Sequence, residues 1–219
     1  MAPVSAPLLI AIDGPAAAGK GTLARRLAAH FGLPYLDTGL LYRAVARRVI
    51  DSGQSPADAT AAAEAARVLV PEDTRRGDLR GPPVDEAASL VASVPAVRAA
   101  LLEFQRAFGR ENGAVLDGRD IGTVVFPQAP AKLFVTASPE ERGRRRWAEL
   151  VARGVAADLG AITAEVHARD AADAARAAAP MKPAADAMLL DTTALDADAA
   201  FAAALAMIGE RLASQGLTR

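Results

Sequence analysis

Two kinds of hydrophobic pattern alternate along this chain. Short apolar runs predict buried strands, and segments with apolar residues three or four positions apart, or rich in alanine, predict helices. Strands that alternate with helices indicate an α/β fold, in which a parallel sheet carries helices on both faces. The five predicted strands span residues 8–12, 33–37, 114–122, 131–137 and 186–193, and the main predicted helices begin near residues 19, 38, 84, 138, 158 and 198.

Residues 51–83 break this alternation. They contain SGQSP, an alanine-rich helical stretch and then PEDTRRGDLRGPP, which is full of turn-forming residues. We interpret this segment as the start of a small lobe inserted between core elements. The following run, 84–108, is predicted to be helical with an interruption at Pro95, and the long run 158–178 is predicted to be one helix.

The clearest chemical signal lies between the first strand and the first helix. A glycine-rich turn in this position lets successive backbone N–H groups surround phosphate oxygens, and the helix N-terminus adds its positive dipole. Lys20 can reach the β- and γ-phosphates, and the Thr22 hydroxyl can join a magnesium shell. A plain glycine turn is the alternative. The predicted phosphate-binding loop consists of Gly14, Pro15, Ala16, Ala17, Ala18, Gly19, Lys20, Gly21 and Thr22.

Charged residues follow the third predicted strand. Arg119 and Asp120 come where that strand ends, and ligands of parallel α/β sheets gather at the carboxyl ends of the strands. We therefore expect both side chains on the same edge as the phosphate-binding loop.

Three residues at the start of the helix from residue 38 are ambiguous. Thr38, Tyr42 and Arg43 could line one anion site at a helix N-terminus. A cap, a packed tyrosine and a surface arginine explain the same pattern.

Two further arginine clusters are ambiguous from the pattern alone. Arg142, Arg145 and Arg146 share one helix face, which is either solvated, RNA-binding or ligand-binding. Arg169, Asp173 and Arg176 form a charged stripe that is either an ion-pair ladder or a reader of a polar ligand. Ser89 and Arg98 lie in the helical run 84–108, where their pattern alone favours solvated side chains.

Composition narrows the class of protein. The 219 residues fit one domain, and 25 basic against 26 acidic residues argue against a protein that coats nucleic acid or a membrane through its net charge. The chain has no cysteine, so disulfides and cysteine-ligated zinc are excluded. No apolar run has the length of a membrane span, and the N-terminus lacks the features of a signal peptide. We expect a cytoplasmic protein, and a monomer.

Seven ordered blocks resemble the bacterial cytidylate kinases, a family of nucleoside monophosphate kinases. The resemblance covers nearly the whole chain. The blocks are IDGPAAAGKGT at 12–22, LDTGLLYR at 36–43, EAASLVASVPAVRAALLEFQRAF at 86–108, DGRDIGTVVFP at 117–127, ASPEERGRRR at 137–146, RDAADAARAAAP at 169–180 and PAADAMLLDTT at 183–193.

The resemblance implies an ATP- and Mg²⁺-dependent (d)CMP kinase with a P-loop α/β/α fold. It implies a five-stranded parallel core of residues 8–50, 109–137 and 177–219, a monophosphate-binding lobe at about 51–108 and an arginine-rich lid with its following helix at about 138–176. The catalytic residues implied are Lys20, Arg119, Asp120 and Arg145. The phosphate-binding loop, Arg142 and Arg146 would bind ATP, with Thr22 on the metal. Thr38, Tyr42, Arg43, Ser89, Arg98, Arg119, Asp120, Arg169, Asp173 and Arg176 would bind CMP or dCMP.

Some positions depart from the family pattern. Thr38 stands where serine is common, Ala16 and Ala17 replace a frequent Ser-Gly, and the segment 54–83 is shorter than in the long bacterial forms. Two alternatives stay open. One is a P-loop kinase for another small acceptor, such as UMP, AMP or shikimate; the other is a nucleotide-binding module without transfer activity.

Overall fold

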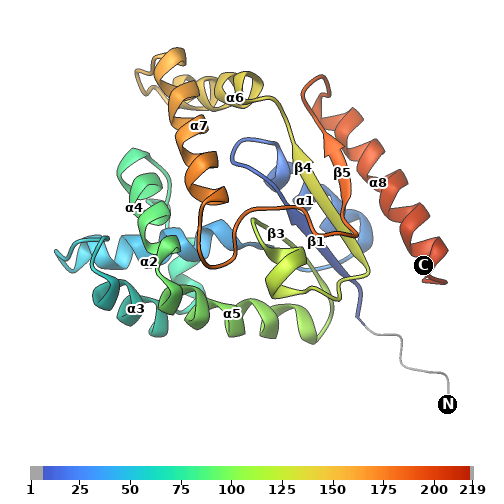
Figure 1. Cartoon of the computed structure of the whole chain (residues 1–219), viewed down its shortest axis with the longest axis horizontal. Coiled ribbons are helices and arrows are strands. Elements are labelled where there is room, and N and C mark those ends of the chain that lie inside the picture. The colour runs from blue at the N-terminus through green and yellow to red at the C-terminus, as the bar shows by residue number, and fades with distance from the viewer. Residues whose placement is uncertain (1–6, 218–219) are drawn as a thin grey trace. The chain divides into compact units, whose positions relative to one another are not determined.

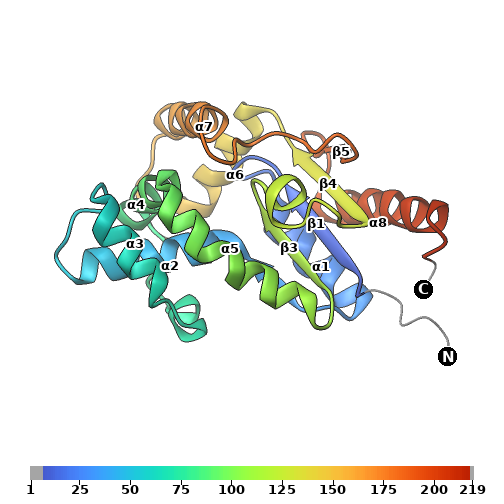
Figure 2. The same ribbon diagram turned by 60° about the horizontal axis from the view of Figure 1, so that its bottom comes forward.

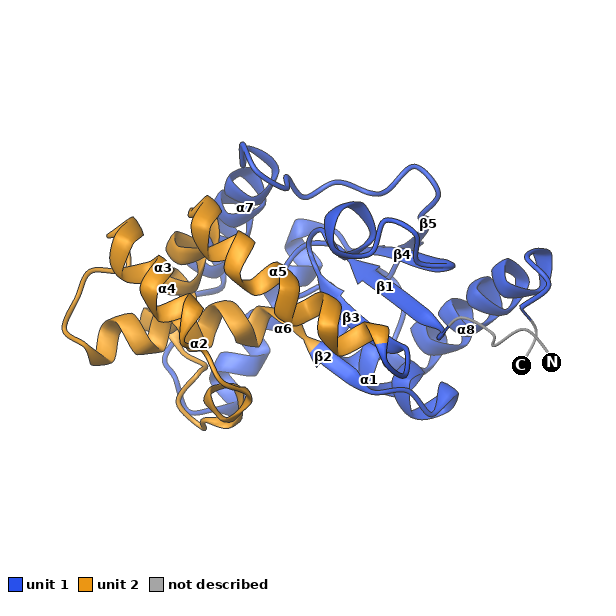
Figure 3. Ribbon diagram, turned by 90° about the horizontal axis from the view of Figure 1, so that it is seen from below, with its two compact units in different colours: residues 1–36, 111–219 blue, residues 37–110 orange. Residues whose placement is uncertain are grey.

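The computed structural model describes residues 7–217, which form two compact units (Figure 3). The first unit contains the chain up to residue 36 and from residue 111 onward, and the second contains residues 37–110. The first unit is built from β1 (Leu9–Asp13), α1 (Lys20–Phe31), β2 (Tyr35–Asp37, whose last residue belongs to the second unit), β3 (Ala114–Gly118), the π-helical turn η2 (Ile121–Val125), β4 (Ala131–Thr136), α6 (Pro139–Ala152), α7 (Leu159–Ala174), β5 (Met188–Asp191) and α8 (Ala197–Ser214).

The five strands form one sheet in the order β2-β3-β1-β4-β5 (Figure 1). β1 pairs in parallel with β3 and β4, and β4 pairs in parallel with β5. This arrangement confirms the predicted α/β fold with a five-stranded parallel sheet. Asp13 at the end of β1 stands opposite Gly118 at the end of β3, so the segments that follow these two strands leave the sheet at the same edge.

The core of the first unit lies between the sheet and helices α1 and α8 (Figure 2). Its members include Ile10 and Ile12 of β1, Leu27 of α1, Leu133 of β4 and Ile208 of α8, each no more than 1% exposed. Burial of such a side chain stabilises the fold by about 1.5–3 kcal/mol relative to exposure. The loop between β1 and α1 therefore connects two elements that are both fixed in this core.

The second unit is helical and consists of α2 (Thr38–Asp51), α3 (Ala59–Arg67), the 3₁₀ turn η1 (Pro71–Arg75), α4 (Pro82–Ser93) and α5 (Pro95–Arg110). Helix α2 packs on α4, and α3 packs on α5. The predicted interruption at Pro95 is confirmed, because α4 and α5 meet there at 94°. Pro95 lacks an N–H and disfavours helical geometry at Val94. Val94 is extended, with ψ at 116°.

In the part of the chain that the structure describes, no single helix has both the length and the apolar character that a membrane span requires. The bent pair of α4 and α5 meets those criteria only when its two helices are counted together.

Two predicted elements end earlier than the sequence pattern indicated. The strand predicted at 114–122 stops at Gly118, because Ile121 and Gly122 each donate a backbone hydrogen bond of 2.7 Å to the Asp13 carboxylate and begin a helical turn instead. The helix predicted at 158–178 stops at Ala174. The alanines that follow favour a longer helix, but Pro180 has no N–H for a helical hydrogen bond and disfavours helical geometry at the residue before it.

The chain turns back after α7, where Met181 donates its N–H to the carbonyl of Asp173 at 2.9 Å.

Two strands are also shorter than predicted. The strand predicted at 33–37 begins only at Tyr35, since Pro34 has no N–H to donate to a neighbouring strand. The residues of this strand are half-buried. The strand predicted at 186–193 spans Met188–Asp191.

Candidate active site

The loop between β1 and α1 has the backbone geometry that a phosphate-binding loop requires. Gly14 has φ at 141°, and a Cβ there would lie 1.9 Å from the carbonyl oxygen of Val135 on the adjacent strand β4. Gly19 is the N-cap of α1 in the left-handed region, with φ at 86°. Only glycine adopts these two conformations without strain or collision. The predicted strand, turn and helix are all present, and residues 14–22 lie at the carboxyl end of the central strand.

The carbonyl groups of this loop bond to side chains around it. Lys20 donates from Nζ to the Pro15 carbonyl at 2.6 Å, and Arg142 of α6 donates to the Ala16 carbonyl at 3.4 Å. The Thr192 hydroxyl lies 3.1 Å from the Ala18 carbonyl. Lys20 is 6% exposed, so its charge lies against the loop rather than in solvent.

Three carboxylates lie at the ends of β1 and β3. Asp117, which the sequence analysis did not select, is buried and accepts a hydrogen bond of 2.9 Å from the Tyr35 hydroxyl. A Cβ on Gly21 would lie 3.7 Å from the Asp117 carboxylate, so this group borders the first turn of α1. Asp117 lies within β3, one residue before its end, so the signal in the sequence was its nearness to Arg119 and Asp120.

The two other carboxylates in this cluster are Asp13 and Asp120, both buried. Burial raises the pKa of Asp13 to about 6 because it disfavours the charged form, although hydrogen bonds from Gly122 and Ile121 act in the opposite direction. The Asp120 charge raises this pKa further, and the Lys20 charge lowers it. Asp120, one of the two residues predicted beside the loop, thus belongs with Asp13 and Lys20 to one buried, electrostatically coupled group.

Arg119 and the charged stripe around α7 come together at one buried carboxylate. Arg119 donates from Nε to Asp173 at 2.8 Å, and Arg176, beyond the end of α7, donates to the other oxygen of the same carboxylate. Burial alone would raise the pKa of Asp173, but Arg119, Arg176 and Arg169 together hold it below its usual value. Asp173 has only 2% of its side chain exposed, so the stripe is not a solvated ladder.

The predicted arginine face of α6 contacts three different parts of the first unit. Arg142 is buried and donates to both oxygens of Asp170 on α7, at 3.0 and 2.5 Å. Arg146 pairs with Glu149 of its own helix at 2.9 Å. Arg145 reaches the turn that follows β5. Sequence spacing placed these arginines on one face, but it could not identify partners that are distant in the chain.

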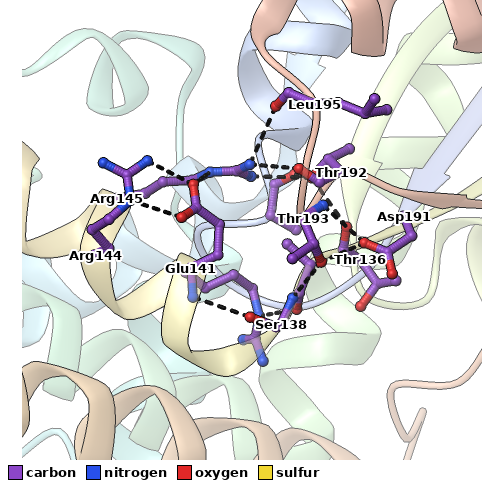
Figure 4. A network of polar contacts seen from close by, with 12 residues as sticks. Thr136, Ser138, Glu141, Arg144, Arg145, Asp191, Thr192, Thr193 and Leu195 are labelled. Atoms are coloured by element: carbon purple, nitrogen blue, oxygen red, sulfur yellow. Dashed lines mark hydrogen bonds and ion pairs between the residues drawn. The ribbon is translucent and has the colours of Figure 1, made fainter.

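Figure 4 shows the contacts of Arg145 and its neighbours. Its Nε donates to Glu141 at 2.8 Å, while Nη1 and Nη2 donate to the Thr192 hydroxyl at 3.0 Å and to the Thr192 carbonyl at 2.6 Å. Hydrogen bonds from Arg144 and then Arg145 lower the pKa of Glu141 to about 2. The Ser138 hydroxyl caps α6, accepting from the Glu141 N–H at 3.2 Å.

The acceptor residues predicted in the second unit lie on α2, α4 and α5. Asp37, rather than Thr38, is the N-cap of α2, and its carboxylate accepts from the Leu40 N–H at 3.3 Å. Thr38 is buried in the first turn. The Arg98 guanidinium lies 5.5 Å from the centre of the Tyr42 ring and donates to the Ala92 carbonyl at 3.3 Å.

Arg43 of α2 is half-buried and pairs with Asp85 of α4. Its Nη1 also donates to the Leu79 carbonyl at 3.1 Å, so Arg43 is held by neighbouring groups rather than extended into solvent. The Ser89 hydroxyl donates to the Asp85 carbonyl at 3.3 Å. The contacts with Asp85 and Leu79 hold one end of the Arg43 guanidinium within the second unit.

Comparison with known proteins identifies relatives of this chain. The family model described as cytidylate kinase matches residues 10–210. A cytidylate kinase from Granulibacter bethesdensis is 67% identical over 89% of this chain and 93% of its own length. Another, from Acidiphilium cryptum, is 62% identical over 94% of this chain and 98% of its own length.

Solved structures share the fold. An uncharacterised protein from Eubacterium ventriosum has a TM-score of 0.54 at 15% identity, covering 93% of this chain and 98% of its own. A putative kinase from Chloroflexus aurantiacus has a TM-score of 0.50 at 18% identity, covering 98% of this chain and 100% of its own.

Proposed function

The chain belongs to the cytidylate kinase family, and from this we propose that it transfers the γ-phosphoryl group of ATP to CMP or dCMP, giving CDP or dCDP and ADP. The observation that supports the donor half of this reaction is the phosphate-binding loop, with its glycine geometry and its buried lysine. The identity over most of the chain supports the choice of acceptor.

The acceptor atom is a phosphate oxygen, which is already an anion. The reaction therefore needs no general base to remove a proton, and catalysis depends on alignment and on neutralising charge in the transition state. Lys20 exchanges its bond to the Pro15 carbonyl for the β- and γ-phosphates of ATP. Arg119 and Arg145 supply further positive charge to the transferring group, and Asp120 belongs to the phosphate end of the acceptor site.

We propose acceptor-binding roles for residues within each unit. In the second unit Thr38, Tyr42 and Arg43 serve the monophosphate, while Ser89 and Arg98 serve cytosine. In the first unit Arg176 serves cytosine, Asp173 the ribose hydroxyls and Arg169 the phosphate. The two ion pairs of Asp173, with Arg119 and with Arg176, support this assignment, because a buried carboxylate between two cations can exchange one partner for a ribose hydroxyl.

Magnesium is a second requirement that we propose. Among residues 7–217, no three His, Cys, Asp or Glu side chains come together as a metal site. In kinases, ATP phosphates and water supply most of the magnesium ligands. Thr22 is exposed in the first turn of α1, and the Asp117 carboxylate borders that turn. Hydroxyl and carboxylate oxygens suit Mg²⁺, so these residues would hold the ion, which neutralises phosphate charge when bound.

Helices α6 and α7 form the lid in this proposal. Arg142, Arg145 and Arg146 are the cations that would serve ATP, and lid closure would exclude water and so limit ATP hydrolysis. Arg145 supports the assignment most directly, since a Cβ on Gly19 would lie 3.8 Å from its Nη1 atom. We further propose that the active form is a monomer.

A coupled ADP-release assay with ATP and Mg²⁺ tests the proposal against CMP, dCMP, UMP, AMP, GMP and shikimate. Turnover strongest with CMP and dCMP supports it. If turnover is strongest with another acceptor, the proposed ATP site stands but the assignment of CMP or dCMP as acceptor is wrong. No turnover from folded protein that binds ATP refutes the enzymatic function and favours a binding module.

A further inference from the structure

Thr192 occupies the turn that follows β5 and is 3% exposed. Its hydroxyl lies 3.1 Å from the Ala18 carbonyl of the phosphate-binding loop and 3.0 Å from the Thr136 carbonyl at the end of β4. The same oxygen accepts a hydrogen bond of 3.0 Å from Nη1 of Arg145. One buried hydroxyl thus joins the loop, the sheet and helix α6.

The loop depends on such contacts because of how it binds phosphate. A backbone that directs N–H groups at an anion must place carbonyl groups elsewhere, and a buried carbonyl without a partner is costly. Pro15 and Ala16 have cationic partners, Lys20 and Arg142, while Ala18 has the neutral Thr192 hydroxyl. In the proposed ATP complex Lys20 leaves the Pro15 carbonyl to bind the phosphates, whereas Thr192 keeps its contact with the Ala18 carbonyl.

Thr192 also fixes an arginine beside the loop (Figure 4). Two atoms of Thr192, its hydroxyl oxygen and its carbonyl oxygen, accept from Arg145, and Glu141 holds the Nε atom. This arrangement places Nη1 of Arg145 3.8 Å from the position of a Cβ on Gly19, the residue at the N-terminus of α1. The hydroxyl therefore contacts both the backbone that would hold phosphate and the arginine next to it.

We propose that Thr192 is a positioning residue for ATP: its hydroxyl sets the conformation of the phosphate-binding loop at Ala18 and orients Arg145 toward that loop. The hydroxyl has one proton, which it donates to a backbone carbonyl while it accepts from Arg145. This inference rests on the proposed role of the loop in binding ATP.

The test compares Thr192→Val, which keeps the shape and removes the hydroxyl, with Thr192→Ser, which keeps the hydroxyl. We expect Thr192→Val to raise both the KM for ATP and the calorimetric Kd for ATP about tenfold, while the KM for CMP changes less than twofold. Thr192→Ser restores both ATP constants to within twofold of the wild type. Thr193→Val is the matched control: its hydroxyl contacts Ser138 and Asp191 in the same turn, but neither the loop nor Arg145.

A merely structural role makes different predictions. If Thr192→Val lowers the melting temperature but leaves the Kd for ATP unchanged, or raises both KM values equally, the inference is wrong. Thr192→Ala repeats the test should the valine variant not fold. Calorimetric ATP binding does not depend on the acceptor, so it tests Thr192 even if CMP turnover is absent and the proposed function fails.

Discussion

The proposed phosphate-binding loop of the first unit and the proposed acceptor residues of the second unit are built in different ways. The loop is made of consecutive backbone groups, constrained at Gly14 by the neighbouring strand. The acceptor residues are side chains on three helices, held by contacts such as that between Arg43 and Asp85. A backbone site tolerates little change, whereas a side-chain site can be altered one contact at a time. We therefore expect all-or-none effects in the loop and graded, substrate-specific effects in the second unit.

The largest effect is expected at the charge centre of the loop. Lys20→Ala should lower kcat by at least about 10³-fold, because the transferring phosphoryl group loses a preorganised cation, while the circular dichroism spectrum stays unchanged. Lys182→Ala is the matched control, since Lys182 is exposed, and it should leave kcat within twofold. A kcat for Lys20→Ala within tenfold of the wild type would show that Lys20 and its loop do not take part in phosphoryl transfer.

The next largest effect is expected on stability, from a change to the loop backbone at Gly14. Gly14→Ala should lower the free energy of unfolding by about 2–5 kcal/mol, because the new Cβ collides with the Val135 carbonyl and positive φ strains alanine. Gly209→Ala, in α8 where a Cβ would meet nothing within 4 Å, should stabilise by about 0.5–1 kcal/mol. Urea unfolding measures both. Equal effects at the two glycines would contradict the described loop geometry.

A graded effect is expected in the second unit. Arg98→Ala should raise the KM for CMP about tenfold or more, the scale of a lost charged hydrogen bond, while the KM for ATP changes less than twofold. Arg106→Ala removes an arginine of the same helix, paired with Glu103 at 3.7 Å, and should change neither constant by more than twofold. Equal increases in both KM values for Arg98→Ala would mean that the residue only supports the fold.

The last effect is a pH dependence of stability from Asp13. Its pKa of about 6 in the folded state exceeds the ordinary value of 3.8, so the folded protein binds more protons between these values. The free energy of unfolding therefore falls as pH rises from about 4 to about 6, by up to about 1.4 kcal/mol per pH unit. Asp13→Asn should flatten this slope in urea unfolding. An identical slope in both proteins would refute the raised pKa.

The same contrast explains what the sequence could predict. The strand, loop and helix around Lys20 are consecutive, so local pattern and glycine spacing were sufficient to predict them. The proposed acceptor residues come from separate helices, and only the family resemblance grouped Ser89 and Arg98 with Thr38, Tyr42 and Arg43. Asp85 illustrates the limit, because its pairing with Arg43 joins residues 42 positions apart.

Other features were missed for identifiable physical reasons. The end of α7 depends on how Pro180 acts against a run of alanines with high helix propensity. Asp117 is a buried carboxylate in an apolar strand, which the pattern did not distinguish from its neighbours. Thr192 gains its importance from Ala18, 174 residues away. Such contacts depend on sheet order, which local periodicity does not specify.

The most direct test of the account follows the phosphoryl group itself. The protein is incubated with Mg²⁺, CMP and ATP labelled with ³²P at the γ-position, and the products are separated by chromatography. We expect the label to appear in CDP, in equal amount to the ADP formed, and we expect Lys20→Ala to abolish this transfer. Label found only in inorganic phosphate, or no transfer by folded protein that binds ATP, would contradict it.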